Sequence, residues 1–156
     1  MFFIGVITNK KNESYLKNEL KSIIPTDNIF IINDGNIENI KNIKFEIVII
    51  DKQINNKLEL RNILSKSKYI ILNSDKEMNV EAINNLKLIA ITYGFNSKCT
   101  FTVSSITENN IIICLQRSIK NIKNEIIEPQ EYILKNEENI EKYAIIATGI
   151  LKILYE

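Results

Sequence analysis

Histidine is absent from the 156 residues of this chain, and cysteine and proline occur only twice each. Without histidine the chain lacks the commonest general base and the commonest metal ligand of proteins. Any chemistry would therefore have to use carboxylates, lysines or hydroxyls. Cys99 and Cys114 lie on different predicted strands, and two cysteines with no zinc-like spacing favour buried thiols in a reducing compartment over a disulfide framework or a zinc site.

An excess of one charge sign is lacking as well. Twenty basic and 19 acidic residues give a net charge of +1, which argues against a nucleic acid or an anionic membrane as partner. The N-terminal MFFIGVI is too short for a signal peptide, and the apolar stretch 143–155 is interrupted by Lys152 and falls short of a bilayer span. We therefore expect a cytoplasmic protein with no nucleic-acid or membrane partner.

The chain contains several short apolar runs that are rich in isoleucine. Its length is that of a single domain. Almost continuous apolar runs are typical of parallel strands that are covered on both faces, and they occur at 2–7, 29–32, 47–50, 69–72 and 89–92. Apolar residues with helical spacing lie between them, at 12–24, 58–64 and 78–86. This alternation predicts right-handed βαβ units in a mostly parallel sheet.

The pattern changes after Gly94. Alternating residues and short turns predict antiparallel strands near 100–105 and 111–115, followed by a strand pair formed by 126–127 and 132–133. Residues 137–156 read as a helix. We thus predict a single α/β domain, with a three-layer parallel part and flanking helices over 1–94, a small antiparallel sheet over 95–136 and a C-terminal helix.

Three fragments, in order, carry a resemblance to a known family: YIILNSDKE, ITYGFNSKCTFTVSSI and NIEKYAIIATGIL. Together they resemble the central, ATP-binding domain of the Mur ligases, which join amino acids to cell-wall precursors. In that family a strand ends in Asn-x-Asp-Asp, the next strand ends in Tyr-Gly or Phe-Gly, three antiparallel strands follow, and an alanine-rich helix closes the domain. The resemblance covers nearly the whole chain and implies a P-loop-like topology.

The segment FIGVITNKKNE stands where the family has its phosphate loop, but the loop glycines are missing. Those glycines let successive backbone N–H groups surround the phosphates. Lys10 and Lys11 could attract an anion, although a solvated turn is the simpler interpretation. The 156 residues also leave no room for the N- and C-terminal domains of the family.

Other catalytic parts of the family have no counterpart in this chain. Asp51 is the only acid at the end of a middle strand, and Lys76 replaces the second aspartate of the motif. Cys99 and Thr100 stand where the resemblance implies an aspartate that contacts the ribose. Ligation through an acyl phosphate requires ATP, magnesium and charge neutralisation, so an ATP-dependent amide ligase is the least favoured function.

We therefore expect a degenerate, non-catalytic Mur-ligase-like domain, a pseudoenzyme without cofactor or metal. It would act as a binding or scaffold module in cell-wall or envelope assembly, with a protein partner or a second copy of itself. The alternative is a domain that binds a nucleotide or small ligand without hydrolysis. Open α/β sheets bind ligands at the carboxyl ends of their strands, and the candidate residues there are Asn73, Asp75, Tyr93, Gly94 and Asn96. For Asp75, a cap on the following helix is a competing interpretation.

Overall fold

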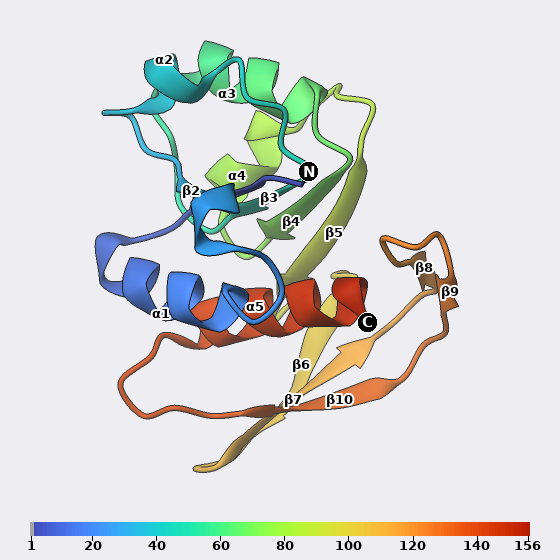
Figure 1. Ribbon diagram of the computed structural model, residues 1–156. Coiled ribbons are helices and arrows are strands. Elements are labelled where there is room, and N and C mark those ends of the chain that lie inside the picture. The colour runs from blue at the N-terminus through green and yellow to red at the C-terminus, as the bar shows by residue number, and fades with distance from the viewer. Residues whose placement is uncertain (1) are drawn as a thin grey trace.

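A sheet of eight strands forms the centre of the molecule, in the spatial order β10-β7-β6-β5-β4-β3-β1-β2 (Figure 1). The computed structural model describes residues 2–156. Strands β1 to β5 run parallel to their neighbours, and their bounds are β1 Ile4–Ile7, β2 Ile29–Ile31, β3 Ile47–Ile50, β4 Tyr69–Asn73 and β5 Ile89–Gly94. The predicted α/β class and the predicted parallel strands are therefore confirmed, with small differences at the strand ends.

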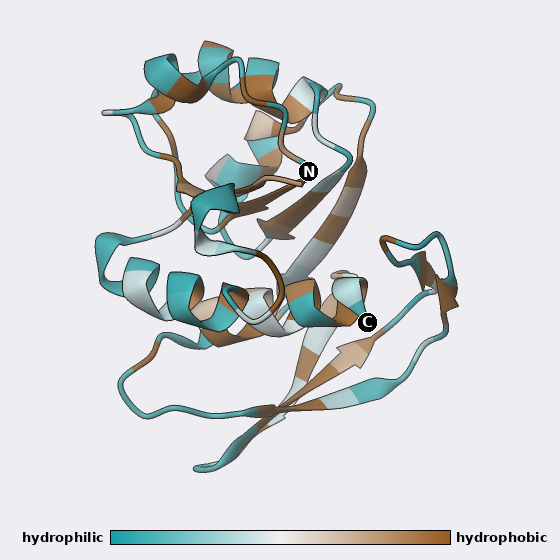
Figure 2. Ribbon diagram, viewed as in Figure 1, coloured by the Kyte–Doolittle hydropathy of each residue, from teal (hydrophilic) through white to brown (hydrophobic). Residues whose placement is uncertain are grey.

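Helices cover both faces of the parallel strands. Helices α1 (Lys10–Leu20) and α5 (Lys142–Tyr155) pack on one face. Helices α2 (Ile37–Ile40), α3 (Lys57–Ser65) and α4 (Glu77–Ala82) lie on the other. Strands β1, β3 and β4 are buried along their whole lengths, which explains their mostly apolar sequences. β3 and β4 are largely brown in Figure 2.

Helix boundaries differ from the prediction for local reasons. Helix α1 ends at Leu20, before the predicted residue 24, and Pro25 then precedes a 3₁₀ turn, Thr26–Asn28. Helix α4 ends at Ala82, and Asn85 beyond it has a φ of 65°, a conformation that an α-helix does not contain. Helix α2 was not predicted, because its four residues are too few to show a helical period.

The antiparallel strands differ from the prediction, which placed all strands after Gly94 in a second, smaller sheet. Strands β6 (Phe101–Ile106), β7 (Asn110–Leu115) and β10 (Glu131–Lys135) extend the main sheet. Only β8 (Ile119–Lys120) and β9 (Ile126–Ile127) form the small antiparallel sheet.

The predicted pairing of 126–127 with 132–133 is wrong, because β10 pairs with β7 and β9 pairs with β8. The segment between β9 and β10 connects two different sheets. Pro129 within it cannot donate a ladder hydrogen bond. Pairing with β7 also gives β10 a buried side: Tyr132 and Leu134 pack against the same core cluster as α5.

Helix α5 joins the parallel and antiparallel parts of the sheet. It starts at Lys142 after an extended Glu141, later than the predicted residue 137, and its buried side packs with residues of β4, β5, β7 and β10. A Cβ at Gly149 would lie 2.7 Å from a methyl carbon of Leu134, so the glycine lets α5 approach β10 closely. Of the helices formed by residues 2–156, none combines the length and the apolar content needed to cross a membrane.

Candidate functional site

The structure brings the five residues selected from the sequence together at the carboxyl ends of β4 and β5. Asn73 ends β4 and pairs with Tyr93 of β5, which Gly94 follows. Asp75 accepts hydrogen bonds from the loop after β5, including one from the side chain of Asn96 at 3.2 Å. The expectation that these residues lie close together therefore agrees with the geometry, and the question is which groups they bind.

Asp51, just after β3, is the buried centre of this region. Its Oδ1 accepts from the Asn73 side-chain amide at 2.8 Å and from the Tyr93 hydroxyl at 3.1 Å. Its Oδ2 accepts from the Thr8 hydroxyl at 3.4 Å, and the Lys76 ammonium lies 3.7 Å from Oδ1. Burial raises the pKa of Asp51, and the opposing effects of Asn73, Lys76 and Tyr93 do not cancel that rise. These contacts use the carboxylate within the protein.

Asp75 has a different role, because it holds the loop that follows β5. Its carboxylate accepts from the Phe95 backbone N–H at 2.8 Å, from the Asn96 backbone N–H at 3.4 Å and from the Tyr143 hydroxyl at 2.8 Å. Partial burial raises the pKa of this carboxyl, but the hydrogen bonds from Phe95, Tyr143 and Asn96 together outweigh burial, so the net shift is downward. Asp75 thus links β4, the loop after β5 and α5.

The interpretation of Asp75 as a helix cap is wrong. Helix α4 begins at Glu77, and Lys76 is its N-cap residue, with no side-chain cap hydrogen bond. The Asp75 carboxylate instead bonds the loop after β5 and Tyr143. Asn73 contributes to this turn by accepting from the Asp75 backbone N–H at 3.1 Å, the local bond by which asparagine favours turns.

Gly94 makes the position of Asp75 possible. Its φ is +157°, which residues with a side chain rarely adopt. A Cβ at this position would lie 2.6 Å from the carboxylate carbon of Asp75. The glycine therefore leaves space for a carboxylate of the protein itself.

After β1, where the resemblance implies a phosphate loop, the chain enters α1 and the carboxylate of Glu141 lies beside its first turn. Lys10 and Lys11, which the sequence suggested as a solvated turn or anion site, form the first residues of α1. Nearby, the side-chain amide of Asn12 donates to the Glu141 carboxylate at 2.7 Å, and the Lys11 ammonium lies 3.6 Å from the same oxygen. The hydrogen bond from Asn12 lowers the pKa of Glu141, burial acts against it, and Lys11 lowers it further.

Several residues of this region were not selected from the sequence. Glu141 and Tyr143 come from a helix far along the chain, and no local pattern connects them to β1 or β4. Asn12 and Asn79 are buried polar residues; the amide of Asn79 donates to the backbone oxygen of Asn73 at 3.3 Å. Their burial could not be read from helical spacing, because a polar residue on an amphipathic helix normally faces water.

Thiol and metal chemistry have little basis at this site. Cys99 is buried, its sulfur lies 2.9 Å from the Ser74 hydroxyl, and burial raises the pKa of its thiol. Cys99 and Cys114 are both free thiols. Within residues 2–156, no three histidine, cysteine, aspartate or glutamate side chains gather closely enough to hold a metal ion.

A comparison of the chain with the models of known protein families finds no match, and a comparison with curated protein sequences finds none either. The resemblance to the Mur ligases therefore stands on the three sequence fragments alone.

Proposed function

We propose that this chain is a non-catalytic, Mur-ligase-like domain that acts as a binding or scaffold module, with cell-wall or envelope assembly as its setting. The observation that carries the non-catalytic part is the Glu141 carboxylate beside the first turn of α1, bonded to Asn12 and close to Lys11. The order of the three fragments supports the link to the Mur ligases. A mostly parallel sheet that continues into β6, β7 and β10 and is packed by α5 is compatible with that link.

The position of Glu141 opposes phosphate binding. In phosphate loops, backbone N–H groups and the positive end of a helix dipole face the phosphates. Here a carboxylate of the protein interacts with the first turn of α1, and it would repel a triphosphate at short range. Residues 8–12 also lack the glycines that let backbone N–H groups surround phosphates, and one donor to a developing oxyanion is worth about 3 kcal/mol of transition-state stabilisation. This corner is therefore poorly suited to phosphoryl transfer.

The corner after β5 supports the same proposal. There Asp75 accepts from the backbone of Phe95 and from the hydroxyl of Tyr143, so that its carboxylate lies against the loop that the resemblance places beside the nucleotide. Acidic and polar groups at both corners thus hold the domain together. A domain stabilised in this way is suited to present surfaces to a partner.

Isothermal titration with ATP and Mg²⁺ tests the proposal. We expect no saturable heat at millimolar ATP and no release of ADP. The variant Glu141→Gln keeps the shape of the side chain and removes its charge; it should remain without turnover, and any gain of weak ATP binding would identify the carboxylate as the repelling group. Micromolar binding of ATP with turnover by the unaltered protein would contradict the proposal.

A second candidate function is nucleotide or small-ligand binding without hydrolysis. It is favoured by the clustering of Asn73, Tyr93 and Asn96 around Asp51 and Asp75 at the strand ends, the usual ligand position in open α/β sheets. A thermal-shift screen of nucleosides and nucleotides separates the two candidates. A ligand present at a hundred times its dissociation constant adds about 2.7 kcal/mol of stability, so a bound nucleotide would raise the melting temperature visibly. No shift with any nucleotide would count against the second candidate.

A further inference from the structure

One edge of β5 is only partly paired. On one side, β5 pairs with β4 from Ile89 to Tyr93. On the other, β6 begins at Phe101, and only Tyr93 and Gly94 of β5 pair with it. The N–H of Thr92 donates to the hydroxyl of Thr100 at 3.2 Å, and the N–H of Thr100 donates to the hydroxyl of Thr92 at 2.9 Å. Within residues 2–156, no strand stands beside residues 89–92 on this side, and we call these four residues the β5 edge.

A cavity of about 760 Å³ lies along the β5 edge. Its opposite wall is the segment from Arg117 to Lys120, which continues the chain after β7. This segment has left the main sheet, since β8 pairs with β9 in the separate two-stranded sheet. The cavity therefore lies between the β5 edge and that small sheet.

Ala90 is the residue of the β5 edge whose backbone groups are directed at this cavity. The carbonyl of Tyr93 accepts from Ser74 at the end of β4, at 3.0 Å. In a strand, the N–H and C=O of one residue point to the same side, and those of the next residue point to the opposite side. The backbone groups of Tyr93 point to β4, so those of Ala90 and Thr92 point away from it. The N–H of Thr92 indeed bonds Thr100, and the N–H and C=O of Ala90 are directed at the cavity. Such an edge is a template for an added strand.

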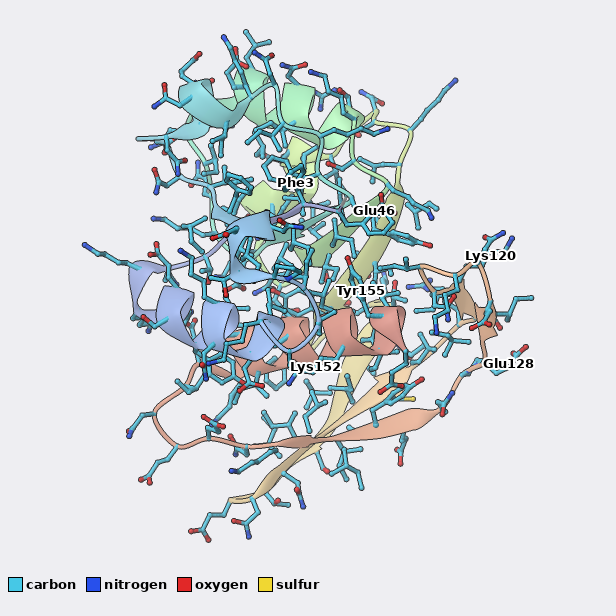
Figure 3. The ribbon with its side chains drawn as sticks, viewed as in Figure 1. Phe3, Glu46, Lys120, Glu128, Lys152 and Tyr155 are labelled. Carbon is cyan, nitrogen blue, oxygen red and sulfur yellow. The ribbon has the colours of Figure 1, made fainter. Side chains whose placement is uncertain are left out.

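The side chains around the cavity specify the chemistry of its occupant. Ile89 and Ile126 are 52% and 64% exposed, and covering them would remove apolar surface from water. The cations Lys98, Arg117 and Lys120 line the cavity, and no acidic residue is among its lining residues. No ion pair within residues 2–156 involves any of these three cations. Figure 3 shows Lys120 in the small β8-β9 sheet, apart from Lys152 and Tyr155 of α5.

We propose that the β5 edge binds an extended acidic peptide of a partner protein as an added strand. This deepens the proposed function and rests on it, because it names the kind of partner that the binding module takes. Four residues of extended peptide span about 13 Å, the length of the β5 edge. Apolar side chains of the peptide would cover Ile89 and Ile126, and its carboxylates would face Lys98, Arg117 and Lys120.

Titration of the full, ¹⁵N-labelled chain with a blocked peptide, Gly-(Glu-Val)₃-Gly, tests the proposal by NMR. We expect saturable shifts of the amide signals of Ala90, Lys98 and Lys120, and slower hydrogen exchange at the Ala90 amide. The same peptide with lysine in place of glutamate should bind at least about tenfold more weakly, a difference of 1.4 kcal/mol. A version with every glutamate and valine N-methylated, which removes the backbone donors on both edges of the peptide, should also lose affinity.

The matched variants change charge at the cavity or away from it. The double variant Lys98→Glu and Lys120→Glu should weaken binding of the acidic peptide by about tenfold or more, since each 1.4 kcal/mol is a factor of ten. Lys66→Glu with Lys135→Glu, two exposed positions on α3's C-cap and β10, makes the same change of net charge away from the cavity and should leave affinity unchanged.

Three results would overturn the inference. Equal binding of the acidic and basic peptides would remove the charge argument. Undiminished binding of the N-methylated peptide would remove the added strand. Binding of dodecanoate at the same residues without binding of the peptide would assign the cavity to a small amphipathic carboxylate. The ATP titration is independent of these results, so the inference can fail while the proposed function stands.

Discussion

The hydroxyl of Tyr143 donates a hydrogen bond of 2.8 Å to the Asp75 carboxylate, across 68 positions of sequence. The contact connects the first turn of α5 with the loop between β4 and α4. Burial first, and then the Asp75 carboxylate, raise the pKa of the Tyr143 hydroxyl. The hydroxyl therefore stays protonated and remains a donor at neutral pH.

Removal of this hydroxyl should weaken the domain slightly. Because Asp75 is exposed, we expect Tyr143→Phe to lower the free energy of unfolding by about 1 kcal/mol, less than the usual value for a bond to a charged acceptor, since solvent weakens the interaction. Urea denaturation measures the change, and NMR titration should show a higher pKa for Asp75. Tyr132→Phe is the matched control, because no hydrogen bond of its hydroxyl is found within residues 2–156. Equal losses in both variants would contradict a role for the Tyr143 bond.

Substitution of Gly94 should cost considerably more. In Gly94→Ala the new methyl group meets the Asp75 carboxylate, and the residue must also keep a φ of +157°. We expect a loss of about 2 kcal/mol or more in the free energy of unfolding. Gly35→Ala is the control, because its Cβ would meet only the Asn33 side chain, at 3.2 Å. In a double-mutant cycle, Gly94→Ala should cost less in the Asp75→Ala background than in the unaltered protein, and equal costs in the two backgrounds would contradict the steric explanation.

Asp51 should be sensitive to the choice of substitute. Asp51→Ala leaves the buried Asn73 amide and Tyr93 hydroxyl without their acceptor, and we expect a loss of about 3 kcal/mol or more. Asp51→Asn keeps one acceptor oxygen and should cost clearly less at neutral pH. Chemical denaturation of the two variants side by side checks the order. Equal losses would show that the shape and the one acceptor oxygen kept by asparagine contribute little, and that this region depends on the charge or on the second acceptor oxygen of Asp51.

The pH dependence of stability should contain opposing contributions. The pKa values of Asp75 and Glu141 are lowered on folding, so the stability they contribute is present above the unfolded carboxyl pKa of about 4 and is lost as the pH falls through their folded values. The pKa of Asp51 is raised, so its contribution is present below the unfolded pKa and is lost as the pH rises through its folded value.

Urea denaturation over a series of pH values separates these contributions. Glu141→Gln and Asp75→Asn should each reduce the loss of stability on the acid side. Asp51→Asn should instead flatten the decline that sets in as the pH rises above about 4. Variants whose pH profiles run parallel to that of the unaltered protein would contradict these assignments.

The parallel half of the fold was predictable because each strand is a separate apolar run that must be buried on both faces. The clustering of Asn73, Asp75 and Tyr93 was predictable for a related reason, since the carboxyl ends of parallel strands meet at one edge. Their partners were not. Tyr143 and Glu141 reach the site from α5, and the sequence does not show which turn of a C-terminal helix will lie against which strand.

The antiparallel half was harder to predict because several pairings satisfy the same alternating pattern. Short turns suggested that 126–127 would pair with 132–133, whereas β10 pairs with β7 and β9 with β8. The choice depends on long-range packing: Tyr132 and Leu134 contact the core cluster that contains α5. Local alternation identifies such strands but leaves their neighbours open.

The position of α5 has a consequence for synthesis of the protein. The core on one face of the sheet is complete once α2, α3 and α4 have been made, because all its buried residues lie before β5. The core on the other face includes buried residues of α5 up to Leu154. Until α5 has been synthesised, α1 alone of the helices within residues 2–156 can cover this face of the sheet. The apolar strand surface that α5 covers therefore stays exposed longer than the opposite face, and such surface makes a partly folded chain prone to aggregation.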